Sequence, residues 1–183
     1  MANHTGRWGR WSTLLAGLPY DVQAALYNRL QPRVDLNPAS VYRLPYLTSI
    51  PRQTVAAGAT NTASYRFVTL TAIYGISKTF DNETVQAVGT TAGVSGLSAV
   101  YPSEVAVQIS FNQGTTTWIG STSEPCNLGV IGDANNITRV DPIIATNTDT
   151  WDVFLTGDAG LANNVFSTVT LHGVKLYGAN GSI

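Results

Sequence analysis

From residue 63 to the end of the chain, apolar residues recur at every second position in several short runs. Successive side chains of a β-strand point to opposite faces, so a period of two predicts strands. Loops rich in Gly, Asn, Asp and Ser separate the runs, which occupy residues 65–74, 104–111, 115–119, 151–156 and 165–177. Seven or eight strands without a helical spacer predict an all-β fold, an antiparallel β-sandwich or jelly roll over residues 63–183.

A helical period occurs only once, near the N-terminus. The apolar residues that share this helical face are Val22, Ala25, Leu26 and Leu30. Pro19 suits the first turn, Asp21 favours the positive N-terminal end of a helix, and Pro32 stops it. The sequence therefore predicts one short α-helix over residues 19–31.

The segments on either side of this helix show neither period. We predict an extended N-terminal arm over residues 1–18. Residues 32–62 hold four of the eight prolines, which indicates a Pro-rich extended connector. Within the connector, residues 41–50 are a candidate edge strand, where proline is tolerated.

Hydroxyl groups rather than charges dominate the polar residues. The chain has 23 threonines and two lysines, and charged residues make up 11% of it, against about 25% in an average soluble protein. A hydrophobic fraction of 44% supplies enough apolar material for a core. Such a composition favours a folded protein that packs against neighbours.

Charge is divided unevenly along the chain. Residues 1–66 hold seven arginines and two acidic residues, a net charge of +5, whereas residues 67–183 hold three basic and nine acidic residues, a net charge of −6. The asymmetry predicts a polar partner for the N-terminal part. Because the arginines form no block, we expect docking on a protein surface, and nucleic acid is an unlikely partner.

The chain contains no run of about 18 apolar residues, so no transmembrane helix and no membrane association are expected. Residues 1–20 lack the apolar segment and cleavage site of a secretory signal peptide.

Two histidines and one cysteine limit the catalytic chemistry that this chain can hold. A Ser-His-Asp triad needs a histidine within reach of a nucleophile and an acid, and the histidines are His4, in the predicted arm, and His172, within a predicted strand. We expect His172 to form a structural hydrogen bond and Cys126 to be a buried or idle thiol. The sequence thus predicts no catalytic residue, no cofactor and no enzymatic activity.

Asp and Asn residues gather in two loops, at Asp133 and Asn135 and between Asp158 and Asn164. Their oxygens are ligands that Ca²⁺ accepts, but neither loop matches a complete calcium-loop consensus. Such side chains commonly accept hydrogen bonds from their own backbone in turns. We interpret both loops as ordinary turns and expect no metal site, with a bound calcium ion as the alternative.

A Gly-Arg-Trp unit occurs twice in the predicted arm. Its candidate partner-binding residues are Arg7, Trp8, Arg10 and Trp11. Arginine beside tryptophan allows cation–π contacts and anchoring in a partner's pocket. Two interpretations stay open: the arm binds a partner, or its indoles cover the protein's own core.

Several segments together resemble a known class of proteins. In the C-terminal third they are residues 142–144 (PII), 150–155 (TWDVFL), 163–165 (NNV) and 170–177 (TLHGVKLY), and earlier ones are 65–68 (YRFV) and 105–113 (VAVQISFNQ). This pattern resembles small β-sandwich, jelly-roll-like virion proteins of tailed bacteriophages, of the head decoration (cement) or minor capsid type. The resemblance covers about residues 50–178 and omits the arm and the helix.

The resemblance implies a non-enzymatic structural protein located in the virion. Its partners would be the major capsid protein or other virion proteins, bound through the arm, and the β-sandwich would form a homo-oligomer, a trimer by analogy. A resemblance of this kind is evidence at the level of the fold.

Two other functions are compatible with the sequence. The first is a single-jelly-roll major coat protein whose basic arm faces the genome. The second is a carbohydrate-binding fibre or receptor-recognition head that uses Trp118, Trp151 or Tyr101 as stacking platforms. Because Trp151 is in phase with Val153 and Leu155, we expect it in the core instead.

Overall fold

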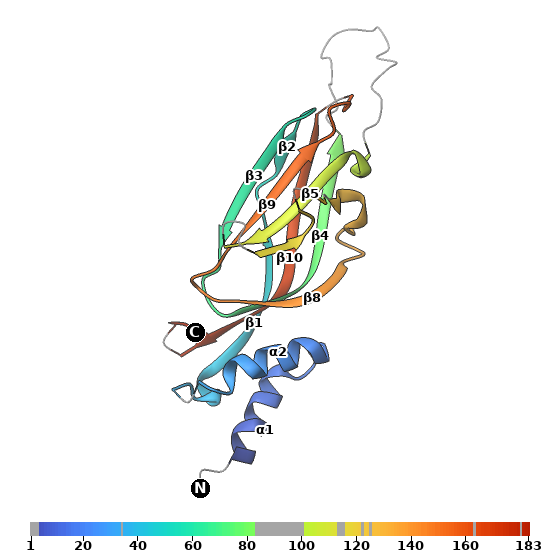
Figure 1. The fold of residues 1–183 in the computed structure, drawn as a ribbon. Coiled ribbons are helices and arrows are strands. Elements are labelled where there is room, and N and C mark those ends of the chain that lie inside the picture. Colours follow the sequence, from blue (N-terminus) through green and yellow to red (C-terminus); the bar gives the residue numbers. More distant parts are fainter. Residues whose placement is uncertain are drawn as a thin grey trace, which may run out of the picture.

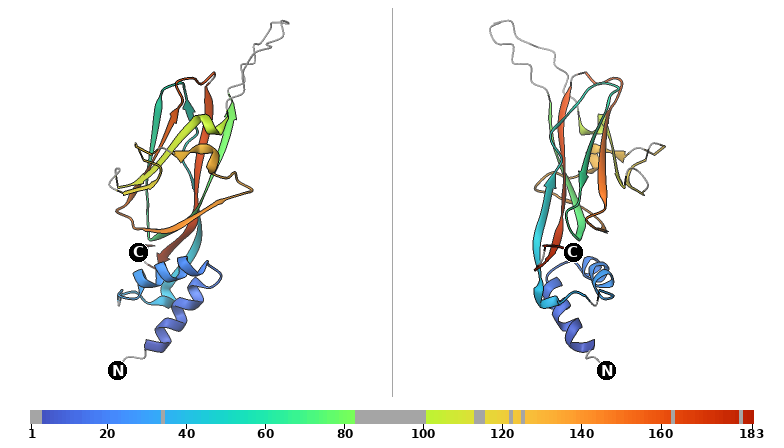
Figure 2. Two further views of the ribbon diagram at one scale, coloured as in Figure 1. Left: turned by 45° about the vertical axis from the view of Figure 1, so that its right-hand side comes forward. Right: turned by 90° about the vertical axis from the view of Figure 1, so that its left-hand side faces the viewer.

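The computed structural model describes residues 4–33, 35–82, 101–112, 116–121, 123–124, 126–162, 164–179 and 181–183. Two antiparallel β-sheets pack against each other, and two α-helices lie beyond one end of them (Figures 1 and 2). The helices are α1 (His4–Leu15) and α2 (Tyr20–Leu30). The predicted all-β antiparallel sandwich is thus confirmed.

Within the described ranges, eight principal strands form the sandwich. They are β1 (Val41–Ser49), β3 (Thr60–Arg66), β4 (Thr71–Asn82), β5 (Val105–Phe111), β6 (Thr116–Ile119), β8 (Thr138–Ala145), β9 (Thr150–Gly157) and β10 (Val165–Gly178). Short strands add to the sheet edges: β2 (Gln53–Val55), β7 (Cys126–Asn127) and β11 (Gly181–Ser182). Single turns of 3₁₀-helix are η1 (Pro38–Ser40), η2 (Pro102–Glu104) and η3 (Leu128–Val130).

The principal strands pair in a nested order. The first strand, β1, pairs with the last, β10; then β3 pairs with β9, β4 with β8, and β5 with β6. The outer and third pairs join as sheet A, in the order β1-β10-β4-β8, and the others as sheet B, in the order β3-β9-β5-β6. This nesting of antiparallel pairs across two sheets is the connectivity of a jelly roll.

The first core fills the space between the sheets. Alternate residues of β5 and β9 point into it, as the period of two predicts, and the buried ones are Val105, Val107, Ile109, Phe111, Trp151, Val153 and Leu155. From sheet A, Val169 and Leu171 of β10 are both 0% exposed in the same cluster. Burial of this apolar surface is the main force holding the two sheets together.

A second core lies on the opposite face of sheet A. In β10 the odd-numbered residues up to Gly173 face the first core, whereas Val174 and Leu176 face the second. The helices cover one end of this face, and Val22, Leu26 and Leu30 of α2 are each fully buried there, so the predicted helix over residues 19–31 is confirmed. Sheet A is therefore covered by sheet B on one face and, at one end of its other face, by the helices.

The extended arm predicted for residues 1–18 is wrong, because these residues contain α1. Two glycines lower the intrinsic helix propensity of this segment and hide the helix in the sequence. Trp11 and Leu15, one helical turn apart, are 1% and 2% exposed in the second core, so tertiary packing holds the helix. Gly17, with a φ of +79°, lies just past its end in the left-handed conformation that favours glycine.

The connector and the first predicted strand also differ in part from expectation. Residues 32–62 contain β1, β2 and the start of β3, and the candidate edge strand at 41–50 is confirmed as β1. The single strand predicted over residues 65–74 is two strands: β3 ends at Arg66 in sheet B, and β4 begins at Thr71 in sheet A. Because β-forming residues continue across the crossing, the pattern does not reveal it.

Candidate interaction surfaces

The predicted partner-binding residues fall into two groups. Arg7, Trp8 and Arg10 belong to α1, and their side chains lie outside the described part of the chain. Trp11 is 1% exposed and packs in the second core with Leu15. The prediction that Trp11 anchors a partner is therefore wrong, because the helix turns this indole toward the protein's own sheet. The second interpretation of the motif is confirmed for Trp11.

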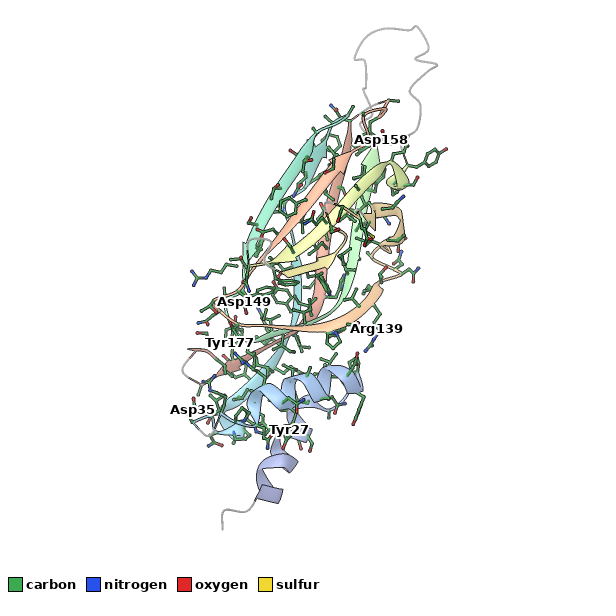
Figure 3. The ribbon with its side chains drawn as sticks, viewed as in Figure 1. Tyr27, Asp35, Arg139, Asp149, Asp158 and Tyr177 are labelled. Carbon is green, nitrogen blue, oxygen red and sulfur yellow. The ribbon has the colours of Figure 1, made fainter. Side chains whose placement is uncertain are left out.

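Polar contacts fix the helical end beside the second core. Arg139 on β8 (Figure 3) donates from Nη2 to Asp21 Oδ1 on α2 at 2.6 Å, and this hydrogen bond lowers the pKa of the Asp21 carboxyl. Arg43 Nη1 on β1 donates to the carbonyl of Ala16 at 2.9 Å. These groups are exposed to solvent, which screens them, so they orient the helices more than they stabilise them.

One edge of sheet A, β1, carries large apolar side chains on its surface. Tyr42, Leu44 and Leu47 are 50%, 40% and 66% exposed. The alternation along β1 places Tyr42 and Leu44 on one face of the sheet and Leu47 on the other. The Tyr42 ring stacks on Tyr177 with centroids 5.8 Å apart, and Lys175 Nζ lies 5.6 Å from the centroid of Tyr177.

The backbone of β1 limits what can pair with its free edge. Ile50, the residue after β1, lies opposite Val169 of β10, and its N–H donates to the Val169 carbonyl. Hydrogen-bonded pairs alternate along an antiparallel ladder, so the even-numbered residues of β1 direct their backbone groups toward β10. Odd-numbered residues direct theirs to the free edge. Pro45 is one of these and has no N–H. An edge strand tolerates proline at such a position, and the missing donor discourages addition of another strand.

The opposite edge of sheet A is β8. Asp141 on this strand is exposed, and Ile137, one residue before it begins, is 44% exposed. The salt bridges found among the described residues do not include Asp141. Pro142 falls where the register between β4 and β8 is interrupted, so each edge of sheet A contains a proline.

His172 forms a side-chain hydrogen bond, as expected from the sequence. Its Nε2 lies 2.7 Å from the Ser77 hydroxyl, and burial lowers the pKa of the imidazole below its ordinary value. Ser77 itself is buried, at 3% exposed. A shallow groove of about 450 Å³ runs beside His172, and its walls include Leu47, Tyr74 and Ile137.

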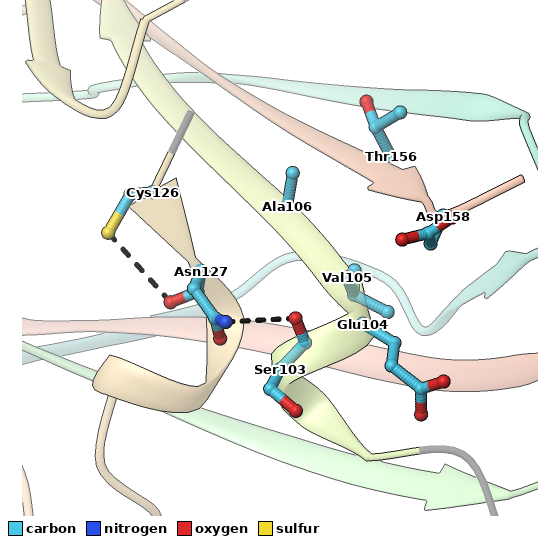
Figure 4. A pocket seen from close by; sticks show the side chains of 9 residues that line it. Ser103, Glu104, Val105, Ala106, Cys126, Asn127, Thr156 and Asp158 are labelled. Carbon is cyan, nitrogen blue, oxygen red and sulfur yellow. Dashed lines mark hydrogen bonds between the residues drawn. The ribbon is translucent and has the colours of Figure 1, made fainter. Parts of the chain in front are cut away.

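A smaller pocket of about 300 Å³ lies where β5, β7 and β9 meet (Figure 4). Two of its carboxylates already bind backbone: Glu104 Oε2 accepts from Tyr101 N at 2.6 Å, and Asp158 Oδ1 accepts from Gly160 N at 3.0 Å. Cys126, half-buried on β7, also lines the pocket. We interpret these carboxylates as turn and helix-cap groups.

The Asp133 loop shows the turn chemistry expected from the sequence. Asp133 Oδ1 accepts from the backbone N–H groups of Asn135 and Asn136, each at 2.9 Å. Among the described residues, no three His, Cys, Asp or Glu side chains come together as metal ligands would. Asn163, in the second predicted loop, lies outside the described residues.

The aromatic residues considered as sugar-stacking platforms lie in different environments. Trp151 is fully buried in the first core, as expected from its phase. Trp118 packs edge-on against Phe111, with ring centroids 5.6 Å apart. Tyr101 is 63% exposed beside η2. Of the three, Trp151 is therefore excluded as a platform.

The exposed residues along the edges of sheet A were not found by sequence reasoning. Tyr42, Leu44 and Leu47 fall in the segment interpreted as a connector, and Asp141 belongs to none of the motifs considered. The signal that was present is the mixture of large apolar residues with Pro45 in one candidate edge strand.

No protein-family model matches this chain, and no curated protein sequence matches it significantly. In the part of the chain that the structure describes, neither helix has the length and apolar character needed to cross a bilayer.

Proposed function

We propose that this protein is a non-enzymatic structural subunit of a virus particle, a capsid decoration (cement) or minor capsid protein that acts as a homo-oligomer. The observation that carries the proposal is the nested strand pairing of a jelly roll, an architecture used by viral capsid domains. The space between the sheets is filled by apolar side chains, so binding takes place on outer surfaces. Lectins share this architecture, and the fold alone does not determine function.

The helical end is the proposed attachment site on coat subunits. It replaces the extended arm as the anchor, because α1 projects from the second core with Arg7, Trp8 and Arg10 in its N-terminal turns (Figure 1). A cationic helix end complements acidic or aromatic groups on a coat subunit. Trp11 holds the helix in place without touching the partner.

The test is co-sedimentation of the labelled protein with capsids assembled from the major capsid protein of the same genome. Deleting α1 would remove Trp11 and Leu15 from the second core, so point variants are required. Arg7→Glu combined with Arg10→Glu should abolish co-sedimentation with little change in melting temperature. Unchanged binding by this folded double variant would refute attachment through α1, and no binding by the wild-type protein would refute the decoration role.

A major coat protein is the second candidate, favoured by the same nested pairing. The two functions predict different products from the purified chain alone. Negative-stain images of closed shells would favour the coat protein, whereas small compact oligomers would favour the decoration protein.

A further inference from the structure

We propose that copies of this chain associate side by side, with the β1 edge of sheet A in one copy packed against the β8 edge in the next. The inference rests on the proposed function, since repeated contact between like subunits is what a shell or its decoration requires. It adds the partner, a second copy, and the two surfaces that meet.

Exposed apolar side chains are the first argument. Tyr42, Leu44 and Leu47 on β1 are between 40% and 66% exposed, and Ile137 beside β8 is 44% exposed. Leu47 and Ile137 also line the same groove across the outer face of sheet A. Tyr42 and Leu44 lie on the opposite face of β1, so the edge has apolar side chains on both faces, and their burial in a contact would remove apolar area from water.

Charge complementarity identifies a second copy as the partner. Arg43 lies on β1 itself and Lys175 on the neighbouring strand β10, opposite Leu44, and the salt bridges among the described residues include neither of them. The β8 edge presents Asp141, which forms no salt bridge among the described residues. Arg139, two residues before it on β8, is paired with Asp21. One edge is thus basic and the other acidic, so contact between two copies brings opposite charges together.

The prolines determine the kind of contact. Pro45 removes a donor from the free edge of β1, and Pro142 interrupts the register of β8. A continuous sheet running from copy to copy is therefore disfavoured, and side chains must make the contact. Because the two surfaces differ, the contact is heterologous, and its repetition gives a ring when the rotation between copies closes and an open filament when it does not.

Sedimentation velocity on the purified full chain tests the proposal. We expect a concentration-dependent oligomer whose dissociation constant rises with salt, because the charged pairs are screened. Leu47→Glu should weaken association at least tenfold, since it places a charge in the apolar contact. Tyr101→Glu is the matched control: Tyr101 is 63% exposed, similar to Leu47, but lies beside sheet B, and this variant should associate normally.

Charge reversal tests the pairing of the two edges directly. Arg43→Glu and Asp141→Lys should each weaken association about tenfold, and the double variant should recover it, because every contact then contains the reversed pair. Arg43 also binds the Ala16 carbonyl, so melting temperatures are recorded. If Arg43→Glu unfolds the protein, Lys175→Glu replaces it in the same cycle.

Three results would overturn the proposal: a monomer at every concentration and salt, a Leu47→Glu chain as oligomeric as the wild type, or no recovery in the double variant. Particle binding is measured separately. A chain that associates through these two edges but never joins particles refutes the proposed function and leaves this proposal intact.

Discussion

Trp11 offers the sharpest test of how the helices are held. Its indole is 1% exposed among the second-core residues on α1, α2 and sheet A. Truncating a fully buried large aromatic residue costs about 3–5 kcal/mol, because apolar contacts are lost and a cavity remains. We therefore expect Trp11→Ala to lower the free energy of unfolding by about 4 kcal/mol.

The buried indole N–H refines this prediction. Trp11 Nε1 is buried, and the described residues offer it no hydrogen-bond acceptor. Burying an unpaired donor costs about 1–3 kcal/mol. Trp11→Phe removes that donor while keeping an aromatic ring, so its net cost should be less than half that of Trp11→Ala.

Urea denaturation, monitored by circular dichroism, measures the free energy of unfolding of both variants. The dependence of this free energy on urea concentration (the m-value) should be the same as in the wild-type protein. Tyr20→Ala is the control, because Tyr20 is 86% exposed and its loss should change stability by less than about 0.5 kcal/mol. If Trp11→Ala keeps the wild-type midpoint but loses particle binding, Trp11 is a partner anchor and the second core is misassigned.

Three further predictions concern sheet A. A Cβ on Gly173 would lie 2.0 Å from the backbone oxygen of Ala72, so Gly173→Ala should destabilise the protein by on the order of 3 kcal/mol in the same urea assay. Burial lowers the pKa of His172, so the unfolded chain binds a proton that the folded protein does not. Stability should therefore fall as pH drops below about 6.5, and His172→Gln should reduce this loss in melts at pH 7.5 and 5.5. Pro45→Thr restores a donor at the free edge of β1 and should increase self-association in size-exclusion chromatography.

Each of these has a contradicting outcome. Gly160→Ala is the control for Gly173, since the nearest atom to its Cβ is 3.8 Å away; equal effects of the two variants would refute the steric argument. A pH profile unchanged by His172→Gln would remove His172 from the acid response. No change in elution of Pro45→Thr would show that the proline does not protect the edge.

The strands of the first core were predictable because burial of one face of a strand produces an alternation of apolar and polar residues in the sequence. Val105, Val107 and Ile109 alternate with more polar residues, and each of them is buried. The pairing order was not predictable, because local pattern does not specify which strands meet. β1 was recognised only as a candidate edge strand, although it pairs along its whole length with β10.

The second core and the edge surfaces were harder to predict for a different reason. α1 depends on burial of Trp11 and Leu15 against distant residues such as Leu176, so its own composition favours a helix only weakly. The interaction residues carry no motif. They were identified by their exposure at a sheet edge, and the edge strands can be recognised only once the strand order of the sheet is known.

The pairing of β1 with β10 also determines when this protein can fold during its synthesis. Val41 pairs with Gly178, so the ribosome makes the first strand long before its partner. Until β10 emerges, β1 has no neighbour in sheet A, and α1 and α2 have no complete face to pack on. The β5–β6 hairpin can close early, but both cores must wait for long loops to close. The nascent chain therefore exposes its apolar residues for most of translation, and a chaperone that shields them is expected to raise the yield of folded protein.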